Sequence, residues 1–418
     1  MVTPMYKKTI AVIDLKAFYS YVECLDRGLD PWTSPLIVAD KERGTNTIVL
    51  SVSPYLKSKG IPSRCRVKEL PKGFNYIYAT PRMERYLEKS AEVVGILMDF
   101  VAKEDIHVYS IDEAFIDLTS YLNYYNKKPK DLVKMIMDSI KEKCGLQATA
   151  GIGDNFFLSK VALDVYAKKE KNGIAVIKKN EVESKIWPIT QLGKIWSIGP
   201  KTEAKLNALG IYSMKDLANS NIELLRAYFG VIGNQLHDLA NGIDDADIHE
   251  EYKPKETSLS QGQVLFKDYN KKEIITVIRE MTDDLALRLR NENKMTEVVA
   301  LFIGYASNKG GFSRQMSLLK ATDDNDLLFE AIMEIFKENI KDLPIRNVGI
   351  NFGKLRVANY EQDSLFNEKQ NKANARNMRK AIDSMHNKYG KNIILRASAL
   401  LEESTIIERH NQIGGHRK

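Results

Sequence analysis

The sequence predicts a multidomain protein that combines α/β with α+β architecture. Strand-like and helix-like segments alternate up to residue 168, and short helical stretches follow as far as residue 240. Between residues 258 and 357 the segments come in the order β-α-β-β-α-β, which indicates a small split βαβ domain. The length of 418 residues agrees, because it is enough for roughly two to four domains.

The first part of the chain begins with a β-branched run at residues 10–13, which is typical of a buried strand and ends at Asp14. The pattern turns helical from Lys16, and a turn-rich stretch over residues 27–78 then indicates a compact insertion bounded by loops. The other elements expected here are a strand at 47–52, a helix at 83–102, strands at 107–111 and 114–118, a helix at 132–144, a strand at 147–152 and a helix at 155–168.

Short helices dominate the middle of the chain, and a stretch with glycine, proline and many charges at 241–255 is typical of a linker. The middle helices are expected at 191–198, 201–209, 213–218 and 222–229. The split βαβ domain is expected to have strands at 258–266, 297–303, 311–317 and 345–357 and helices at 272–291 and 326–337. Further helical pieces are expected at 373–389 and 394–403.

The composition is that of a folded protein with a mild positive charge. Lysine and arginine number 62 against 55 aspartates and glutamates, so the formal net charge is +7. Charged residues make up 28% and hydrophobic residues 44%, which is typical of soluble globular chains and not of disordered ones. The small excess hints at a polyanionic partner such as nucleic acid without identifying one.

Cysteine usage and apolar run lengths indicate the cytoplasm. Cys24, Cys65 and Cys144 lie far apart without a Cys-x-x-Cys pair, which gives no support to a disulfide framework or a cysteine zinc site. The apolar run at 9–13 is too short for the core of a signal peptide. The best membrane candidate, at 91–102, contains two acids and falls short of the ~18 apolar residues of a span. We therefore expect a cytoplasmic protein with no membrane partner.

Carboxylates at the ends of two predicted strands indicate a metal-binding site. Asp14 ends the first strand, and Asp112 and Glu113 lie at the tip of the predicted hairpin, so three carboxylates converge if these strands share a sheet. Mg²⁺ prefers oxygen ligands, and two ions about 3.5–4 Å apart can clamp an in-line phosphoryl transfer. The alternative is a solvated strand end and a charged turn. The apolar residues around each acid weaken that alternative, because a carboxylate among buried residues needs a partner.

Three motifs occur in order along the chain. They are IDLKAFY at 13–19, YSIDEAFID at 109–117, and GIGDN followed by LSKVA within 151–162. Together they resemble the Y-family of translesion DNA polymerases, and most closely its UmuC-like branch of bacteria, phages and plasmids. The resemblance implies a right-hand polymerase with a palm at 1–26 and 79–168, fingers at 27–78, a thumb with a helix-hairpin-helix at 169–240, a linker at 241–255, a little finger at 256–359 and a C-terminal tail at 360–418.

The resemblance implies that Asp14, Asp112 and Glu113 are catalytic carboxylates that bind two Mg²⁺ ions. The carbonyl of Leu15 would complete the coordination of one ion. The implied reaction is template-directed DNA synthesis from deoxynucleoside triphosphates (dNTPs), with low fidelity, bypass of damaged bases and no proofreading. A palm-type nucleotidyl cyclase and a non-catalytic DNA-binding protein are the alternatives. The first does not need a DNA-gripping thumb, and the second does not need all three carboxylates.

The resemblance also implies a nucleotide-binding set. The ring of Tyr19 falls where the family excludes a ribose 2′-hydroxyl, and the backbone of Phe18 lies beside it. Lys57 and Lys160 align with basic residues that contact the triphosphate, with Ser51 as a weaker candidate. The alternative for the two aromatic residues is a place in the core of a helix.

Two departures from the family pattern bear on this set. Many relatives have a tyrosine where Pro54 or Tyr55 stands, so the register around Lys57 is open. Lys16 stands where relatives often have an acid or an amide, and it brings a positive charge close to the metal site.

Segments for holding DNA follow. The run SIGPKT at 197–202 predicts a helix-hairpin-helix, in which Gly199 and Lys201 face a phosphate at a helix N-terminus and grip the duplex without reading its sequence. The alternative is an ordinary turn between helices. In the little finger, Arg314 and Arg356 are candidate contacts to the primer-template DNA.

A short motif after the split βαβ domain predicts a protein partner. Gln362, Leu365 and Phe366 offer one amide and two apolar anchors and resemble the pentapeptide that binds the bacterial sliding clamp. The alternative is a surface turn with two docked apolar groups. The basic tail beyond it is expected to meet DNA or a protein partner, and the UmuC-like branch also implies accessory subunits of the SOS response.

Overall fold

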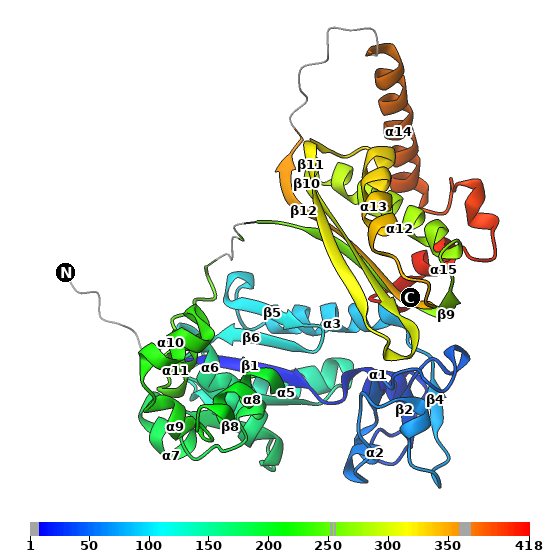
Figure 1. Cartoon of the computed structure of the whole chain (residues 1–418). Helices are drawn as coiled ribbons and strands as arrows, with labels where there is room; N and C mark the ends of the chain where they lie inside the picture. Colours follow the sequence, from blue (N-terminus) through cyan, green and yellow to red (C-terminus); the bar gives the residue numbers. More distant parts are fainter. Residues whose placement is uncertain (1–7, 251–253, 255, 359–368) are drawn as a thin grey trace. The chain divides into compact units, whose positions relative to one another are not determined.

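The structure of the protein is a computed structural model that describes residues 8–250, 254, 256–358 and 369–418. Contacts divide the chain into two compact units, Met1–Glu251 and Tyr252–Lys418. Figure 1 shows the course of the chain through each unit.

The first unit is built on a five-stranded sheet with the order β5-β6-β1-β7-β8. The central strand β1 pairs antiparallel with β6 and β7, and β7 pairs parallel with β8. The bounds are β1 (Ile10–Leu15), β5 (Ile106–Ser110), β6 (Glu113–Asp117), β7 (Ala148–Gly153) and β8 (Ile174–Ile177). Strand β8 lies past residue 168, so the palm sheet extends into the segment expected to belong to the thumb.

Each face of this sheet has its own core, because alternate residues of β1 point to opposite sides. Ala11 and Ile13 pack with the helices α1 (Phe18–Asp26), α3 (Met83–Met98) and α5 (Pro129–Cys144). Ile10 and Val12 pack with α6 (Phe156–Val161) and with the helices of the thumb. The thumb helices are α7 (Val182–Lys185), α8 (Pro200–Ala208), α9 (Met214–Ala218), α10 (Ile222–Phe229) and α11 (Val231–Ala240). The thumb and the palm therefore share one hydrophobic core.

The insertion between α1 and α3 folds as a small sheet with the order β3-β2-β4. Its elements are β2 (Leu36–Val38), β3 (Ser51–Val52), α2 (Pro54–Ser58) and β4 (Ile77–Ala79). Ile37, Val52 and Leu56 lie in a separate core, while Leu36 and Val38 on the opposite face of β2 join the palm core. The alternation along β2 thus joins the insertion to the palm.

The second unit contains the predicted βαββαβ arrangement. Its sheet has the order β11-β10-β12-β9 with antiparallel neighbours, and α12 and α13 pack on one face of it (Figure 1). Val264 and Phe302 on the opposite face are exposed. The bounds are β9 (Leu259–Tyr269), α12 (Glu273–Asn291), β10 (Lys294–Tyr305), β11 (Gly311–Thr322), α13 (Asn325–Asn339) and β12 (Ile345–Val357).

The end of the chain folds back onto the helices of the second unit. Arg409 and His410 of α15 bond to Asp284 of α12, and Asp383 of α14 pairs with Arg290. The elements are α14 (Lys369–Tyr389), a 3₁₀ turn at Ala397–Leu400, α15 (Ile406–His410), β13 (Gln412–Ile413) and β14 (His416–Arg417). Arg409 and His410, which belong to the expected basic tail, thus form ion pairs within the second unit. Among the described helices of the whole chain, none is both long and apolar enough to cross a membrane.

Candidate active site

The pairing of β1 with β6 brings the predicted carboxylates to one edge of the palm sheet. Asp14 lies directly opposite Glu113 in the register of the two strands. The backbone N–H of Leu15 donates to the carbonyl of Asp112 at 2.9 Å, so the hairpin tip is tied to the end of β1. The hydroxyl of Ser110 donates to the Asp112 carboxylate at 2.8 Å. The acids come together because Asp14 follows the apolar run of β1 and Glu113 precedes that of β6, and these two runs fix the strand register.

A chain of alternating charges joins two of these acids. The ammonium of Lys160 lies 2.8 Å from the Glu113 carboxylate and 3.1 Å from that of Asp164. Lys168 lies 3.1 Å from Asp164 on one side and 3.3 Å from Asp14 on the other. Two lysines therefore balance much of the negative charge gathered at this edge.

Burial and repulsion from neighbouring carboxylates raise the pKa values of Asp14 and Glu113. Burial is the largest cause that raises the pKa of Asp14, and the neighbouring Asp112 raises it further against the opposing charge of Lys168. Burial also raises the pKa of Glu113, which Lys160 opposes and Asp14 reinforces. A site with these properties favours cations and groups that bring positive charge.

The two lysines reach the acids because of the local backbone. A Cβ at Gly151 would lie 2.0 Å from the carbonyl oxygen of Ser159, so only glycine lets α6 pack directly on β7. The expected helix at 155–168 is interrupted by a π-helical turn at Ala162–Tyr166, which contains Asp164 and precedes Lys168. The sequence motif predicted Lys160, but Asp164 and Lys168 were missed, although the spacing of four residues from Lys160 to Asp164 and from Asp164 to Lys168 was a signal that they share a helix face.

The aromatic pair follows a sharp turn. Ala17 adopts a left-handed conformation with φ 49° and ψ 40°, and α1 begins at the next residue. Phe18 is buried, while the half-buried ring of Tyr19 lies near Asp112, whose charge adds to desolvation in raising the pKa of the Tyr19 hydroxyl. The hydroxyl of Ser51 lies 2.9 Å from that of Ser20 and donates to the carbonyl of Ala17 at 3.4 Å. Ser51 thus holds the turn from the side of the insertion.

Basic residues of the insertion also face the site. Desolvation lowers the pKa of Lys57, and the nearby charges of Asp14 and Asp112 oppose that change. Arg64 lies close enough to Tyr19 and Lys57 to influence both electrostatically. Arg64 was missed by sequence reasoning, because it lies in a loop at φ 66° that no motif marks. The Lys16 ammonium lies 5.8 Å from the centre of the Trp32 ring.

The helix-hairpin-helix segment presents a helix N-terminus to solvent. Gly199 precedes α8, and a Cβ placed there would meet no atom within 4 Å. Gly199 and Lys201 are both exposed, which leaves room for a phosphate group. The indole N–H of Trp196 donates to the hydroxyl of Tyr109 at 3.0 Å, so this segment contacts the strand that leads to Asp112.

The candidate DNA contacts of the second unit lie on different faces of its sheet. Arg314 pairs with Leu301 in the register, which places it on the helix-covered side of the edge strand β11, where it is exposed. Arg356 comes two residues after Lys354, whose φ is 49°, and forms an ion pair with Glu297 at 2.6 Å. The clamp-binding candidates Gln362, Leu365 and Phe366 lie outside the described residues.

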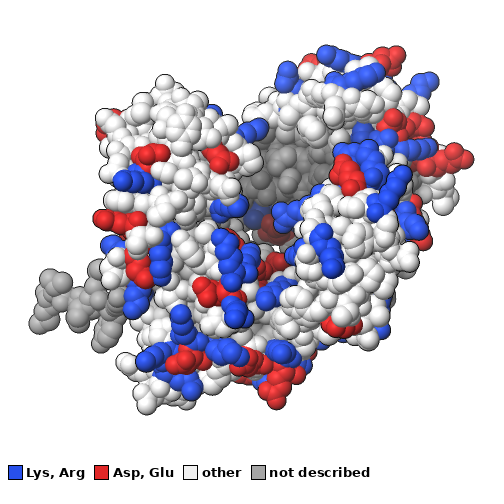
Figure 2. Space-filling view, turned by 90° about the horizontal axis from the view of Figure 1, so that it is seen from below, with Lys and Arg blue, Asp and Glu red and all other residues white. Residues whose placement is uncertain are grey.

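Surface charge is mixed. On the face shown in Figure 2, lysine and arginine side chains lie beside acidic ones over much of the surface. The net charge of +7 is therefore a poor guide to where a polyanion would bind.

The matches to known protein families cover the segments in which the motifs lie. A profile of the impB/mucB/samB family matches residues 13–164, that of its C-terminal domain matches 256–365, and the helix-hairpin-helix motif of the same family matches 179–211. The putative UV-damage repair protein UvrX of Bacillus subtilis is 33% identical over 98% of both chains. The chain belongs to the Y-family of translesion DNA polymerases. Like the other members of this Y-family, it is a DNA-directed DNA polymerase.

Other relatives agree with this Y-family membership. DNA polymerase IV 2 of Bacillus subtilis is 30% identical over 99% of this chain and 100% of its own. A solved chimera of the Y-family polymerases Dbh and Dpo4 has a TM-score of 0.67 and 20% identity, and the match covers 84% of this chain and 99% of that one. The solved structure supports the predicted right-hand fold, and the family profiles support its helix-hairpin-helix and little finger.

Proposed function

We propose that the site at the strand ends of the palm sheet, where Asp14, Asp112 and Glu113 meet, catalyses primer extension. In this reaction the 3′-hydroxyl of a primer attacks the α-phosphate of a template-paired dNTP, and pyrophosphate leaves. The observation that carries the proposal is the facing pair Asp14 and Glu113, joined through Lys160, Asp164 and Lys168. The site thus offers carboxylates for metal ions beside lysines for a triphosphate. We further propose that synthesis has low fidelity and lacks proofreading.

The donor set fits Mg²⁺ in its chemistry. Asp14, Asp112 and Glu113 supply carboxylate oxygens and Leu15 a carbonyl oxygen, the hard ligands that Mg²⁺ prefers. Burial, reinforced by neighbouring carboxylates, raises the pKa of Asp14 and Glu113, and a bound cation would favour their charged forms. No three acidic, histidine or cysteine side chains of the described residues converge as a preformed metal cluster. We propose that these residues would hold two Mg²⁺ ions when the nucleotide is bound.

Two such ions would supply positive charge for the attacking and leaving oxygens of the transfer. The chain's own residues do the rest. Lys168 and Lys57 neutralise the triphosphate, and Lys160 holds the Glu113 carboxylate in place through its short contact. The ring of Tyr19 excludes a 2′-hydroxyl by its bulk, which makes the site selective for deoxyribose.

DNA is held by parts outside the palm. Gly199 and Lys201 contact a phosphate of the duplex at the start of α8. Arg314 and Arg356 are proposed as weaker contacts of the little finger, because one lies beside the helices and the other is already paired with Glu297. The motif at 362–366 recruits a sliding clamp, and the protein acts in the cytoplasm, where SOS accessory subunits are candidate partners.

Primer extension on a template with an abasic site, with and without the clamp, tests this function. The wild-type protein with Mg²⁺ and dNTPs should extend the primer past the lesion, and the clamp should lengthen the products. Replacing the primer-template with ATP alone tests the cyclase alternative. Cyclic product from ATP combined with no primer extension would contradict the proposal.

A further inference from the structure

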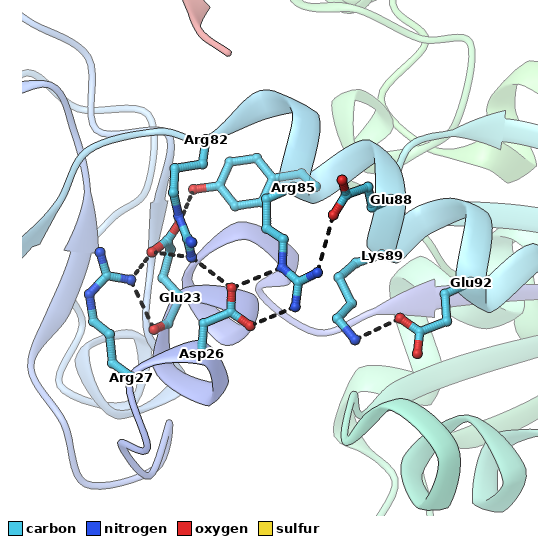
Figure 3. Close-up of polar contacts among 9 residues, drawn as sticks. Glu23, Asp26, Arg27, Arg82, Arg85, Glu88, Lys89 and Glu92 are labelled. Atoms are coloured by element: carbon cyan, nitrogen blue, oxygen red, sulfur yellow. Dashed lines mark hydrogen bonds and ion pairs between the residues drawn. The ribbon is translucent and has the colours of Figure 1, made fainter.

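A fully buried carboxylate lies one helical turn from Tyr19. The Glu23 side chain on α1 is 0% exposed. It accepts hydrogen bonds from one side chain of α3 and from the residue that precedes α3. Arg82 donates through Nε at 2.9 Å and Nη2 at 3.0 Å, and the Tyr86 hydroxyl donates at 2.7 Å. Arg27 forms a third contact with the same carboxylate. Figure 3 shows Arg82 and Arg27 converging on Glu23.

Tyr86 connects this carboxylate to the proposed sugar-selecting ring. Its ring centre lies 4.7 Å from that of Tyr19 at 49°, and 6.3 Å from that of Phe18. Tyr19 and Glu23 are four residues apart, so they lie on the same face of α1. One tyrosine therefore packs on the Tyr19 ring with its own ring and bonds to Glu23 with its hydroxyl. Burial raises the pKa of Tyr86 to about 12, so its hydroxyl keeps the proton that it donates.

Further ion pairs join α1 to the start of α3. Arg82 also donates to Asp26 at 2.7 Å, and Arg85 holds both oxygens of Asp26 at 3.0 Å (Figure 3). A planar guanidinium that binds a carboxylate with two parallel bonds fixes direction as well as distance. α1 is thus held against the start of α3 by directional bonds at two successive positions.

Stability alone does not account for a charge at this place. A well-packed apolar group often stabilises a core as well as a buried ion pair does, and in some proteins a buried ionic group instead specifies the geometry of the groups around it. The geometry fixed here is that of the ring behind Tyr19, and the exclusion of a single hydroxyl depends on small displacements of that ring.

We propose that Glu23, Arg82 and Tyr86 are positioning residues that hold the Tyr19 ring in place and thereby set the discrimination between deoxyribose and ribose. The proposal rests on the proposed function, in which Tyr19 contacts the sugar. None of the three acts on the nucleotide directly, and their effect passes through Tyr19.

The test measures kcat/KM for one dNTP and for its ribonucleotide in the wild type, Tyr86→Phe and Glu23→Gln. Tyr86→Phe keeps the ring and removes only the hydroxyl. We expect it to reduce the ratio of the two kcat/KM values about fivefold, equivalent to about 1 kcal/mol. Glu23→Gln should reduce the ratio at least as much. Arg82→Lys, which keeps a charge but loses the paired bonds, serves if Glu23→Gln does not fold.

Tyr125→Phe is the matched control, because it removes a tyrosine hydroxyl that donates to the carbonyl of Phe100 at 3.0 Å elsewhere in the palm. Its ratio should equal that of the wild type. In a Tyr19→Ala background, Tyr86→Phe should have no further effect on the ratio, since the ring through which it acts is gone.

The outcomes separate the two proposals. If the wild type incorporates no nucleotide, the proposed function fails and this inference falls with it. If the wild type discriminates between sugars but the Tyr86→Phe and Glu23→Gln ratios stay within twofold of it, this inference alone is overturned. An equal loss of discrimination with and without Tyr19 also overturns it, because the effect would then not pass through that ring.

Discussion

Replacing Arg409 with methionine should unfold the second unit more easily and leave the first unit unchanged. Arg409 is 7% exposed in its side chain, and its partners Glu280 and Asp284 on α12 are 4% and 7% exposed. Its guanidinium lies 3.3 Å from Glu280 and 3.1 Å from Asp284. The substitution Arg409→Met keeps most of the apolar volume and leaves two buried carboxylates without this cation.

The expected loss of stability follows from the contacts that remain. Breaking a buried ion pair by removing one partner costs about 3–5 kcal/mol. Asp284 keeps a contact with His410 at 2.8 Å, and Glu280 keeps the hydroxyl of Ser404 at 2.6 Å. The loss should therefore be at the lower end, about 3 kcal/mol, which corresponds to a fall of about 6–12 °C in Tm for a unit of this size.

The position of the tryptophans makes the assay specific. Trp32, Trp187 and Trp196 all belong to the first unit, so their fluorescence follows that unit, whereas far-ultraviolet circular dichroism follows both. Arg409→Met should lower a transition seen by circular dichroism and leave the fluorescence transition in place. Arg396→Met is the matched control, because Arg396 pairs with the adjacent Asp283 but is 53% exposed, and it should cost less than about 1 kcal/mol. Equal effects of the two substitutions would refute the reasoning.

Three further predictions concern the site, the linker and the partner. Lys168→Met should raise the KM for dNTPs about tenfold by removing a charge beside Asp14, whereas Lys169→Met at the neighbouring position should not raise it. Equal KM values of the two variants would contradict this. The hydrogen bond to Asp105 is the largest cause that raises the pKa of the His249 imidazole. The stabilisation from this contact is therefore fully present below the usual histidine pKa of about 6.5 and is lost as the pH rises through the raised pKa. His249→Gln should therefore lower the Tm of the fluorescence transition more at pH 6 than at pH 9, and the reverse order would be inconsistent with the contact. Deleting residues 362–366 should abolish stimulation of primer extension by the clamp and spare extension without it, whereas undiminished stimulation would exclude the motif.

The sequence predicted the parts of the site that depend on local patterns. Asp14 follows an apolar run and Glu113 precedes one, and such runs determine strand register, so the facing carboxylates could be expected before the structure was known. The split βαβ order of the second unit was predicted and confirmed for the same reason, since the periods of its strands and helices are long and regular. The right-hand polymerase fold was confirmed by the likeness to a solved Y-family structure.

Residues positioned by irregular backbone or by distant partners could not be predicted. Lys168 follows a π-helical turn that no pattern of side chains announces. The role of Ser51 at the nucleotide stays a prediction, and its contact with Ser20 of α1, 31 residues earlier in the chain, is one that no local pattern indicates. Arg409 reads as part of a basic tail in the sequence, because the acids that bury its charge lie more than a hundred residues earlier.

The measurement that tests the central claim most directly is Mg²⁺-dependent primer extension by the double variant Asp112→Asn, Glu113→Gln. Both substitutions keep the shape of the side chains and remove their charge, so circular dichroism should show a folded variant, with a lower Tm because the ion pair of Lys160 with Glu113 is lost. The account predicts extension by the wild type and no detectable extension by the variant at any Mg²⁺ concentration. Extension by the folded variant at the wild-type rate would contradict the assignment of the catalytic carboxylates.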